Sequence, residues 1–161
     1  MNTAIRSTLI VFLLAPWAGA LLASEVPLMG VVSVVDGDTL SMGKERIRMH
    51  GIDAPESSQT CLRAGRPWRC GQAAALALSD RIGRQIVRCE LVDRDRWGRA
   101  VATCFVGADS LNQWLVQEGW ALDWPRYSRG KYAEEQRRAE EARLGIWTSE
   151  FQAPWDWRRS K

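Results

Sequence analysis

The sequence predicts an α+β protein in which a small closed barrel of five β-strands is accompanied by three α-helices. Five short β-branched or alternating runs are joined by turn-forming residues, and three further segments have helical spacing of apolar residues. The 161 residues are enough for one moderate hydrophobic core. Closure into a barrel is expected because short, hairpin-connected strands otherwise leave exposed edges.

The first three strands follow one another closely. Residues 30–35 are a β-branched run, and Asp36-Gly37 is a strong hairpin-turn dipeptide, after which residues 39–42 return as a second strand. Residues 45–52 alternate as a third strand.

The rest of the chain continues the pattern of helices and strands. The expected elements are a loop at 57–70, a helix at 71–82, strands at 85–92 and 99–106, a helix at 110–118, a loop at 120–130, a helix at 132–143, and an aromatic, proline-containing tail at 146–157. Ala and Leu at helical spacing predict the first helix, and Ser110 is a suitable N-cap for the second. Gly145 marks the end of the third.

The N-terminus has the pattern of a secretory signal peptide, with a positive start, a short apolar run and small residues after it. A membrane anchor is the alternative, but the apolar run is short and is broken by Pro16. Cleavage after Ala20 or Ala23 fits, and we choose Ala23, which gives a signal peptide at 1–23 and one domain at 24–161 with an aromatic C-terminal tail. We therefore expect an exported protein, periplasmic or extracellular, without stable membrane association after cleavage.

The total charge says little about partners. The formal net charge is +3, and removal of a signal peptide whose only charge is Arg6 lowers it to +2. A chain this mildly basic must be interpreted from where its charges lie rather than from their sum.

The four cysteines predict two disulfide bonds. An even number in an exported chain favours disulfides over free thiols, and the absence of a CxxC spacing, together with a single His, argues against zinc. Of the three possible pairings we choose Cys61–Cys70, which closes a short loop, and Cys89–Cys104. The second pair lies nearly symmetrically about a polar turn at 93–99, so its members can face each other across a hairpin.

Three short polar segments carry the groups that a metal-assisted phosphodiesterase needs. They are Val35-Asp36-Gly37-Asp38-Thr39, Arg48 to Glu56, and Asp95-Arg96-Trp97-Gly98-Arg99. Asp38 and Asp53 are candidate carboxylate ligands for a hard cation, and Glu56 is a candidate for handling water. Arg48 and Arg99 are candidates for binding phosphate through their guanidinium forks.

Each segment also has an ordinary structural explanation. Asp-Gly-Asp is common in turns, Asp53 with Glu56 is a possible capping box at a helix start, and the third segment suits a solvated, ion-paired turn. His50 is expected to be packed or at the surface rather than catalytic. The three segments together, in this order and each beside an apolar strand-like run, favour a site.

The same segments resemble the staphylococcal nuclease (thermonuclease) family, with further matches at 111–119 and 144–147. The resemblance covers about residues 30–147 and implies an OB-type barrel of five strands with three helices. It also implies Ca2+-dependent hydrolysis of DNA and RNA, with single strands and loosened duplex preferred and 3′-phosphate ends as products.

The resemblance assigns roles residue by residue. It implies that Asp38, Asp53 and the backbone carbonyl of Ala54 bind Ca2+, that Glu56 handles water, that Arg48 and Arg99 bind phosphate, and that Arg96, Trp97 and Tyr127 contact the nucleic acid. The family commonly has Thr at the position of Ala54, and a lysine and a tyrosine at those of Arg96 and Trp97. The loop from Cys61 to Cys70 is absent from the staphylococcal enzyme, and we expect it to shape access to Glu56.

Three functions compete. A non-catalytic OB-fold module for nucleic acid or protein would be expected to lack some of the acidic or Arg positions, and an oligosaccharide-binding protein would not need the pair Arg48 and Arg99. Every side chain carried over from the family is present. The sequence therefore predicts an exported, monomeric, Ca2+-dependent and sugar-non-specific endonuclease acting on DNA and RNA.

Overall fold

A computed structural model describes residues 26–161, and the predicted signal peptide lies outside the described residues. Within 26–161, none of the helices combines the length and the apolar character that a membrane span requires.

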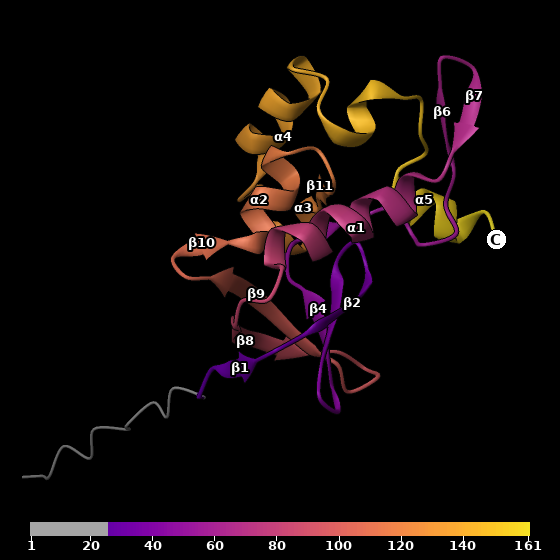
Figure 1. Cartoon of the computed structure of the whole chain (residues 1–161). Helices are drawn as coiled ribbons and strands as arrows, with labels where there is room; N and C mark the ends of the chain where they lie inside the picture. The colour runs from indigo at the N-terminus through magenta and orange to yellow at the C-terminus, as the bar shows by residue number, and fades with distance from the viewer. Residues whose placement is uncertain (1–25) are drawn as a thin grey trace, which may run out of the picture.

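The main sheet is curled and mixed, with strand order β1-β8-β9-β4-β3-β2 (Figure 1). The strands are β1 Leu28–Gly30, β2 Ser33–Asp36, β3 Thr39–Met42, β4 Glu45–Met49, β8 Val87–Arg94 and β9 Ala100–Val106, with β10 Asp109–Ser110 paired to β9. Strands β4 and β9 run parallel, whereas the other pairs are antiparallel. Only Val31 and Val32 separate β1 from β2, the two ends of this order, so the sheet curls. Strands β1 and β2 are not paired with each other, so the sheet is a half-barrel and not the closed barrel that the sequence predicted.

The α+β class is confirmed, but the predicted count of five strands is wrong. The main sheet has seven strands, because the run at 28–36 is interrupted between β1 and β2 and because β10 adds a short strand. Two small pairs lie outside it: β5 (Ile52–Asp53) with β11 (Leu122–Asp123), and β6 (Cys61–Arg63) with β7 (Arg66–Trp68). The predicted loop at 57–70 therefore contains a hairpin.

The prediction of three helices is also too low. The described residues contain α1 Cys70–Ile82, α2 Leu111–Gln117, α3 Pro125–Ser128, α4 Ala133–Glu141 and α5 Pro154–Arg159, with a 3₁₀ helix, η1, at Gly145–Thr148. Helices α1, α2 and α4 are the predicted ones. Helices α3 and α5 lie in segments predicted as loop and tail, and each starts with a proline, which suits the first helical position because its missing N–H has no partner there.

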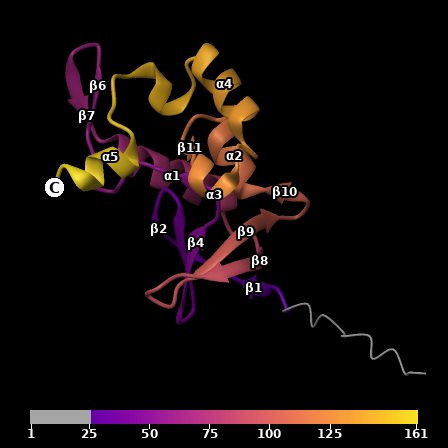
Figure 2. The same ribbon diagram turned by 180° about the vertical axis from the view of Figure 1, so that it is seen from behind.

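The main core lies between the curled sheet and helices α1 and α2. Helix α1 packs against β2 and α2 packs against β9, around buried residues that include Leu40, Ile47, Leu78, Leu111 and Leu115. A second, smaller cluster gathers Trp68, Trp147, Phe151 and Trp155 around the first disulfide. Seen from both sides, the β6–β7 hairpin and α5 lie together at one end of the molecule (Figures 1 and 2).

Both predicted disulfides are present. Cys61 in β6 is bonded to Cys70 at the start of α1, and Cys89 is bonded to Cys104. The latter two residues are direct partners in the β8–β9 ladder, as expected from their symmetric placement about the turn. Two disulfides indicate an oxidising environment.

We expect strong reductant to lower the melting temperature. A disulfide that closes a loop of about 15 residues stabilises a protein by about 3 kcal/mol, mainly by restricting the unfolded chain. The Cys89→Ala/Cys104→Ala variant should reproduce about half of the loss measured by circular dichroism after full reduction of the wild type, because the Cys61–Cys70 bond closes a second loop of similar length. An unchanged melting temperature under reducing conditions that break both bonds would contradict a stabilising role.

Candidate active site

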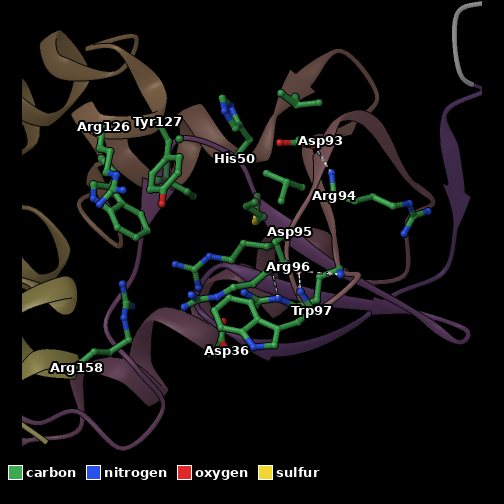
Figure 3. Close-up of a pocket in the computed structure, with 18 of the residues that line it drawn as sticks. Asp36, His50, Asp93, Arg94, Asp95, Arg96, Trp97, Arg126, Tyr127 and Arg158 are labelled. Atoms are coloured by element: carbon green, nitrogen blue, oxygen red, sulfur yellow. Dashed lines mark hydrogen bonds and ion pairs between the residues drawn. The ribbon is translucent and has the colours of Figure 1, made fainter.

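The predicted site residues other than Asp38, Asp53 and Ala54 line one groove of about 1020 Å³. Its wall is built from β4, the turn between β8 and β9, and helices α3 and α5. Figure 3 shows Arg126 and Tyr127 on one side of the groove and Asp93 and Arg94 on the other. Arg48, Glu56, Arg96, Trp97 and Arg99 also line it.

Asp38 and Asp53 do not line the groove themselves, but both are bonded to the guanidinium of Arg48, which does. Nη1 of Arg48 donates to Oδ1 of Asp38 and Nη2 donates to Oδ1 of Asp53. The other oxygen of Asp38, Oδ2, accepts the backbone N–H of Ala54 at 2.7 Å. Asp38 is 1% exposed and Asp53 is 0% exposed, so both carboxylates are removed from water.

Local chain geometry explains why these groups meet. The predicted Asp36-Gly37 turn is present between β2 and β3, and a Cβ added at Gly37 would lie 2.7 Å from Cβ of Ala54. Glycine therefore lets the turn approach Ala54 closely enough for the Asp38 contact. On the next strand, Arg48 pairs with Thr39, directly beside Asp38.

Burial determines the electrostatics of the two carboxylates. Loss of hydration raises the pKa of Asp38 to about 8 and also raises the pKa of Asp53, while the positive charge of Arg48 opposes both shifts. The two buried carboxylates share one guanidinium, that of Arg48, whose positive charge compensates part of the cost of burying them.

The donor set suits a hard divalent cation. Carboxylate oxygens are the ligands that Ca2+ prefers, and Asp38 and Asp53 already converge on one cationic group. Among the described residues, however, no three His, Cys, Asp or Glu side chains gather into a metal-binding cluster. A cation held here would thus need backbone carbonyl or water ligands as well, and the proposed role of the Ala54 carbonyl remains a prediction.

Glu56 lies in a short loop that is fixed from two sides. The buried Gln59 accepts the N–H of Glu56 through Oε1 at 3.3 Å and donates from Nε2 to the carbonyl of Gln152 at 2.7 Å. Gly71 of α1 packs against this loop. A Cβ added at Gly71 would lie only 1.7 Å from the carbonyl oxygen of Glu56, so the close contact requires glycine. The capping-box alternative is wrong, because Asp53 belongs to β5 and no helix begins between β5 and α1.

Arg99 reaches the groove from the β8–β9 turn. The parallel register of β4 and β9 pairs Arg48 with Val101, which brings the preceding residues of the turn beside β4. Oδ2 of Asp95 accepts Nε of Arg99 at 2.7 Å, and Oδ1 accepts the backbone N–H groups of Trp97 and Arg99 at 3.0 Å each. Burial raises the pKa of Asp95, but these hydrogen bonds outweigh it and hold the pKa below its ordinary value. The segment is therefore an ion-paired turn, which was the ordinary structural explanation for its charges, and its residues also line the groove.

Aromatic side chains lie at the open parts of the groove. The ring of Trp97 is 66% exposed, and Cζ of Arg96 lies 4.2 Å from its centroid. Tyr127 belongs to α3. This helix is held near the site by the β5–β11 pairing and by the hydrogen bond from the Trp124 N–H to the Gly51 carbonyl. The structure thus brings together all the predicted substrate-contacting residues.

His50 is half-buried in the groove wall just after β4. Burial and the charge of Lys131 lower its pKa, with Asp93 opposing them. The environment of His50 thus favours the neutral form of its ring.

The sequence analysis missed Arg158, which belongs to α5 in the C-terminal tail. Its Nη1 and Nη2 donate to Oδ1 and Oδ2 of Asp53 at 3.0 and 2.9 Å, and Nη1 also donates to Oε1 of Glu56 at 2.6 Å. Burial lowers the pKa of Arg158, but these ion pairs outweigh it and raise the pKa. In the sequence, Arg158 is one residue of a basic end, and no motif or spacing links it to Asp53.

Comparison with known proteins identifies relatives of most of the chain. The model of the family described as "Staphylococcal nuclease homologue" matches residues 46–149. The succinoglycan biosynthesis protein ExoI of Rhizobium meliloti is 39% identical over 127 residues, which are 77% of this chain and 66% of that protein. A micrococcal nuclease of Shigella flexneri is 31% identical over 147 residues, covering 81% of this chain and 79% of that protein.

Plant relatives are longer than this chain. The probable staphylococcal-like nuclease CAN1 of Oryza sativa subsp. japonica is 32% identical over 127 residues, which are 78% of this chain but 36% of that protein. This chain thus spans about a third of the rice protein and just under two thirds of the Rhizobium protein. The family match covers more than half of the chain and includes β4, β8, β9 and α2. The chain belongs to the staphylococcal nuclease homologue family.

Proposed function

We propose that this protein is an exported, Ca2+-dependent endonuclease that hydrolyses phosphodiester bonds of DNA and RNA without selecting the sugar. Membership of the family supports nuclease activity and nucleic acid substrates. The single observation that carries the proposal is that two buried carboxylates, Asp38 and Asp53, are bonded to Arg48, which lines one groove together with Glu56 and Arg99.

In this proposal Asp38, Asp53 and the Ala54 carbonyl hold Ca2+, which when bound polarises the phosphorus centre and neutralises charge on the phosphate oxygens. Arg48 and Arg99 bind the phosphate from β4 and from the β8–β9 turn.

Glu56 orients the attacking water and accepts its proton. Its side chain lines the groove, its backbone N–H is held by Gln59, and its carboxylate is paired with Arg158. A positioned base of this kind contributes about 10²–10⁴ to a rate.

The groove walls account for the expected substrate range. Phosphate contacts carry no base information, and exposed rings such as Trp97 and Tyr127 stack on any unpaired base. Arg96 adds a positive charge beside Trp97. Single strands are favoured because their bases are free to stack, and both DNA and RNA fit this mode.

Two other functions are less well supported. A non-catalytic OB-fold module would need neither Glu56 nor a buried carboxylate pair. The name of the Rhizobium relative refers to succinoglycan biosynthesis, but a saccharide-binding groove would not need the two arginines, Arg48 and Arg99, that line this one. We further propose that the protein acts as a monomer.

The test is to incubate the purified protein, with Ca2+ present, with single-stranded DNA, single-stranded RNA and duplex DNA of one sequence. We expect internal cleavage of both single strands, slower cleavage of the duplex, and 3′-phosphate products that a 3′-phosphatase converts to 3′-hydroxyl ends. Salt-sensitive binding of all three without cleavage would instead favour the non-catalytic module.

A further inference from the structure

Helix α5 brings a second guanidinium, besides that of Arg48, to the carboxylates from outside the part of the chain that matches the family model. The match ends at residue 149, whereas Arg158 lies in α5 and bonds both oxygens of Asp53 and one oxygen of Glu56. Figure 3 shows Arg158 entering the groove from its own side, away from Trp97 and Arg96. Neither the family nor the three sequence segments accounts for this contact.

The position of α5 is built into the fold. Trp155 stacks on Trp124 with ring centroids 6.0 Å apart and planes 18° apart, and Cζ of Arg158 lies 5.4 Å from the Trp124 ring. Upstream of α5, Leu62 and Glu150 exchange two backbone hydrogen bonds of 2.8 Å. Leu62 belongs to β6, which the first disulfide fastens to α1, so the tail is anchored to the same loop that carries Glu56.

Arg158 takes up the oxygen atoms that a cation would need. Asp53 is fully buried, and its Oδ2 accepts from Arg158 while its Oδ1 accepts from both Arg158 and Arg48. A divalent cation bound to Asp53 must therefore replace a guanidinium contact and must also stand close to a positive charge. Both effects oppose its binding.

The same contact restrains Glu56. Its Oε1 accepts Nη1 of Arg158 at 2.6 Å, a charge-assisted hydrogen bond. While Arg158 bridges Asp53 and Glu56, the carboxylate that is proposed to handle water is engaged in an ion pair.

We propose that Arg158 is an internal competitor of the divalent cation at Asp53. Metal loading displaces Arg158 from Asp53 and frees Glu56, so that α5 sets the metal affinity of the site and couples the release of Glu56 to metal binding. The inference rests on the proposed function in one respect, because it takes Asp53 as a metal ligand.

The test measures Ca2+ binding to the full chain by isothermal titration calorimetry, without nucleic acid. We expect Arg158→Ala to lower the Kd for Ca2+ by about tenfold, because no guanidinium has to leave Asp53 and one neighbouring positive charge is gone. Arg158→Lys keeps the charge but cannot cover both carboxylate oxygens, so its Kd should fall between the two. Arg159→Ala is the matched control, since Arg159 lies on the same helix, is 76% exposed and pairs with Asp156.

The possible outcomes separate the two proposals. Equal or weaker Ca2+ binding by Arg158→Ala than by the wild type overturns the competition, and it leaves the proposed nuclease intact. Absence of Ca2+ binding in the wild type and in Arg158→Ala overturns the metal site and therefore both proposals. If the melting curve shows that Arg158→Ala is unfolded, Arg158→Lys decides by the same criterion: a lower Kd supports the competition, and an equal or higher Kd overturns it.

Discussion

Arg99→Ala is expected to slow phosphodiester cleavage by about 10²–10³-fold, the usual cost of losing one preorganised group that stabilises transition-state charge. The ion pair of Arg99 with Asp95 uses Nε, and so it does not consume the two Nη atoms whose fork matches phosphate oxygens. The fold should survive, because Asp95 keeps its hydrogen bonds to the backbone N–H groups of the turn and a half-exposed ion pair contributes little stability.

The measurement is the initial rate on single-stranded DNA at saturating Ca2+, together with the melting temperature. Arg84→Ala is the matched control, because it removes one exposed Arg from the turn after α1, outside the groove. If Arg99→Ala and Arg84→Ala cleave at similar rates, Arg99 does not act on the phosphate.

Glu56→Gln is expected to lower the rate by about 10²–10⁴-fold, since the amide cannot accept a proton from water. Gln has nearly the same shape, and its carbonyl oxygen can still accept the hydrogen bond from Arg158, so the local structure should be retained. Binding of uncleaved DNA should change little, because Glu56 is proposed to act on water rather than on the phosphate.

Glu90→Gln provides the control for this substitution. Glu90 is an exposed carboxylate of β8 that pairs with Arg88, away from the groove. Single-turnover rates of both variants, measured with DNA affinity in the presence of EGTA, separate the chemical step from binding. Equal rates for Glu56→Gln and the wild type would remove Glu56 from the mechanism.

The parts of the fold that the sequence predicted are those determined by local patterns. The Asp36-Gly37 turn, the helical spacing of α1 and the symmetric placement of Cys89 and Cys104 each depend on nearby residues, and each is found in the structure. The β6–β7 hairpin was missed because its strands are three residues long and one contains Pro67, so neither has a readable alternation.

The sequence predicted those residues of the candidate site that lie in the three polar segments. Asp38, Asp53 and Arg48 come together through pairing of β3 with β4 and through a turn that needs glycine, both of which are local. Arg158 lies 105 residues from Asp53, and its position depends on how the tail pairs with β6. Such a contact has no signature in spacing or composition, because it is created only when the tail packs.

The initial rate of single-stranded DNA cleavage should be measured as free Ca2+ is raised from an EGTA-buffered zero. We expect no cleavage in EGTA and a saturating rise with a midpoint of about 10⁻⁴–10⁻³ M, the range of extracellular calcium sites. Full activity in EGTA, or no cleavage at any Ca2+ concentration by the folded protein, would contradict a Ca2+-dependent nuclease site built on Asp38 and Asp53.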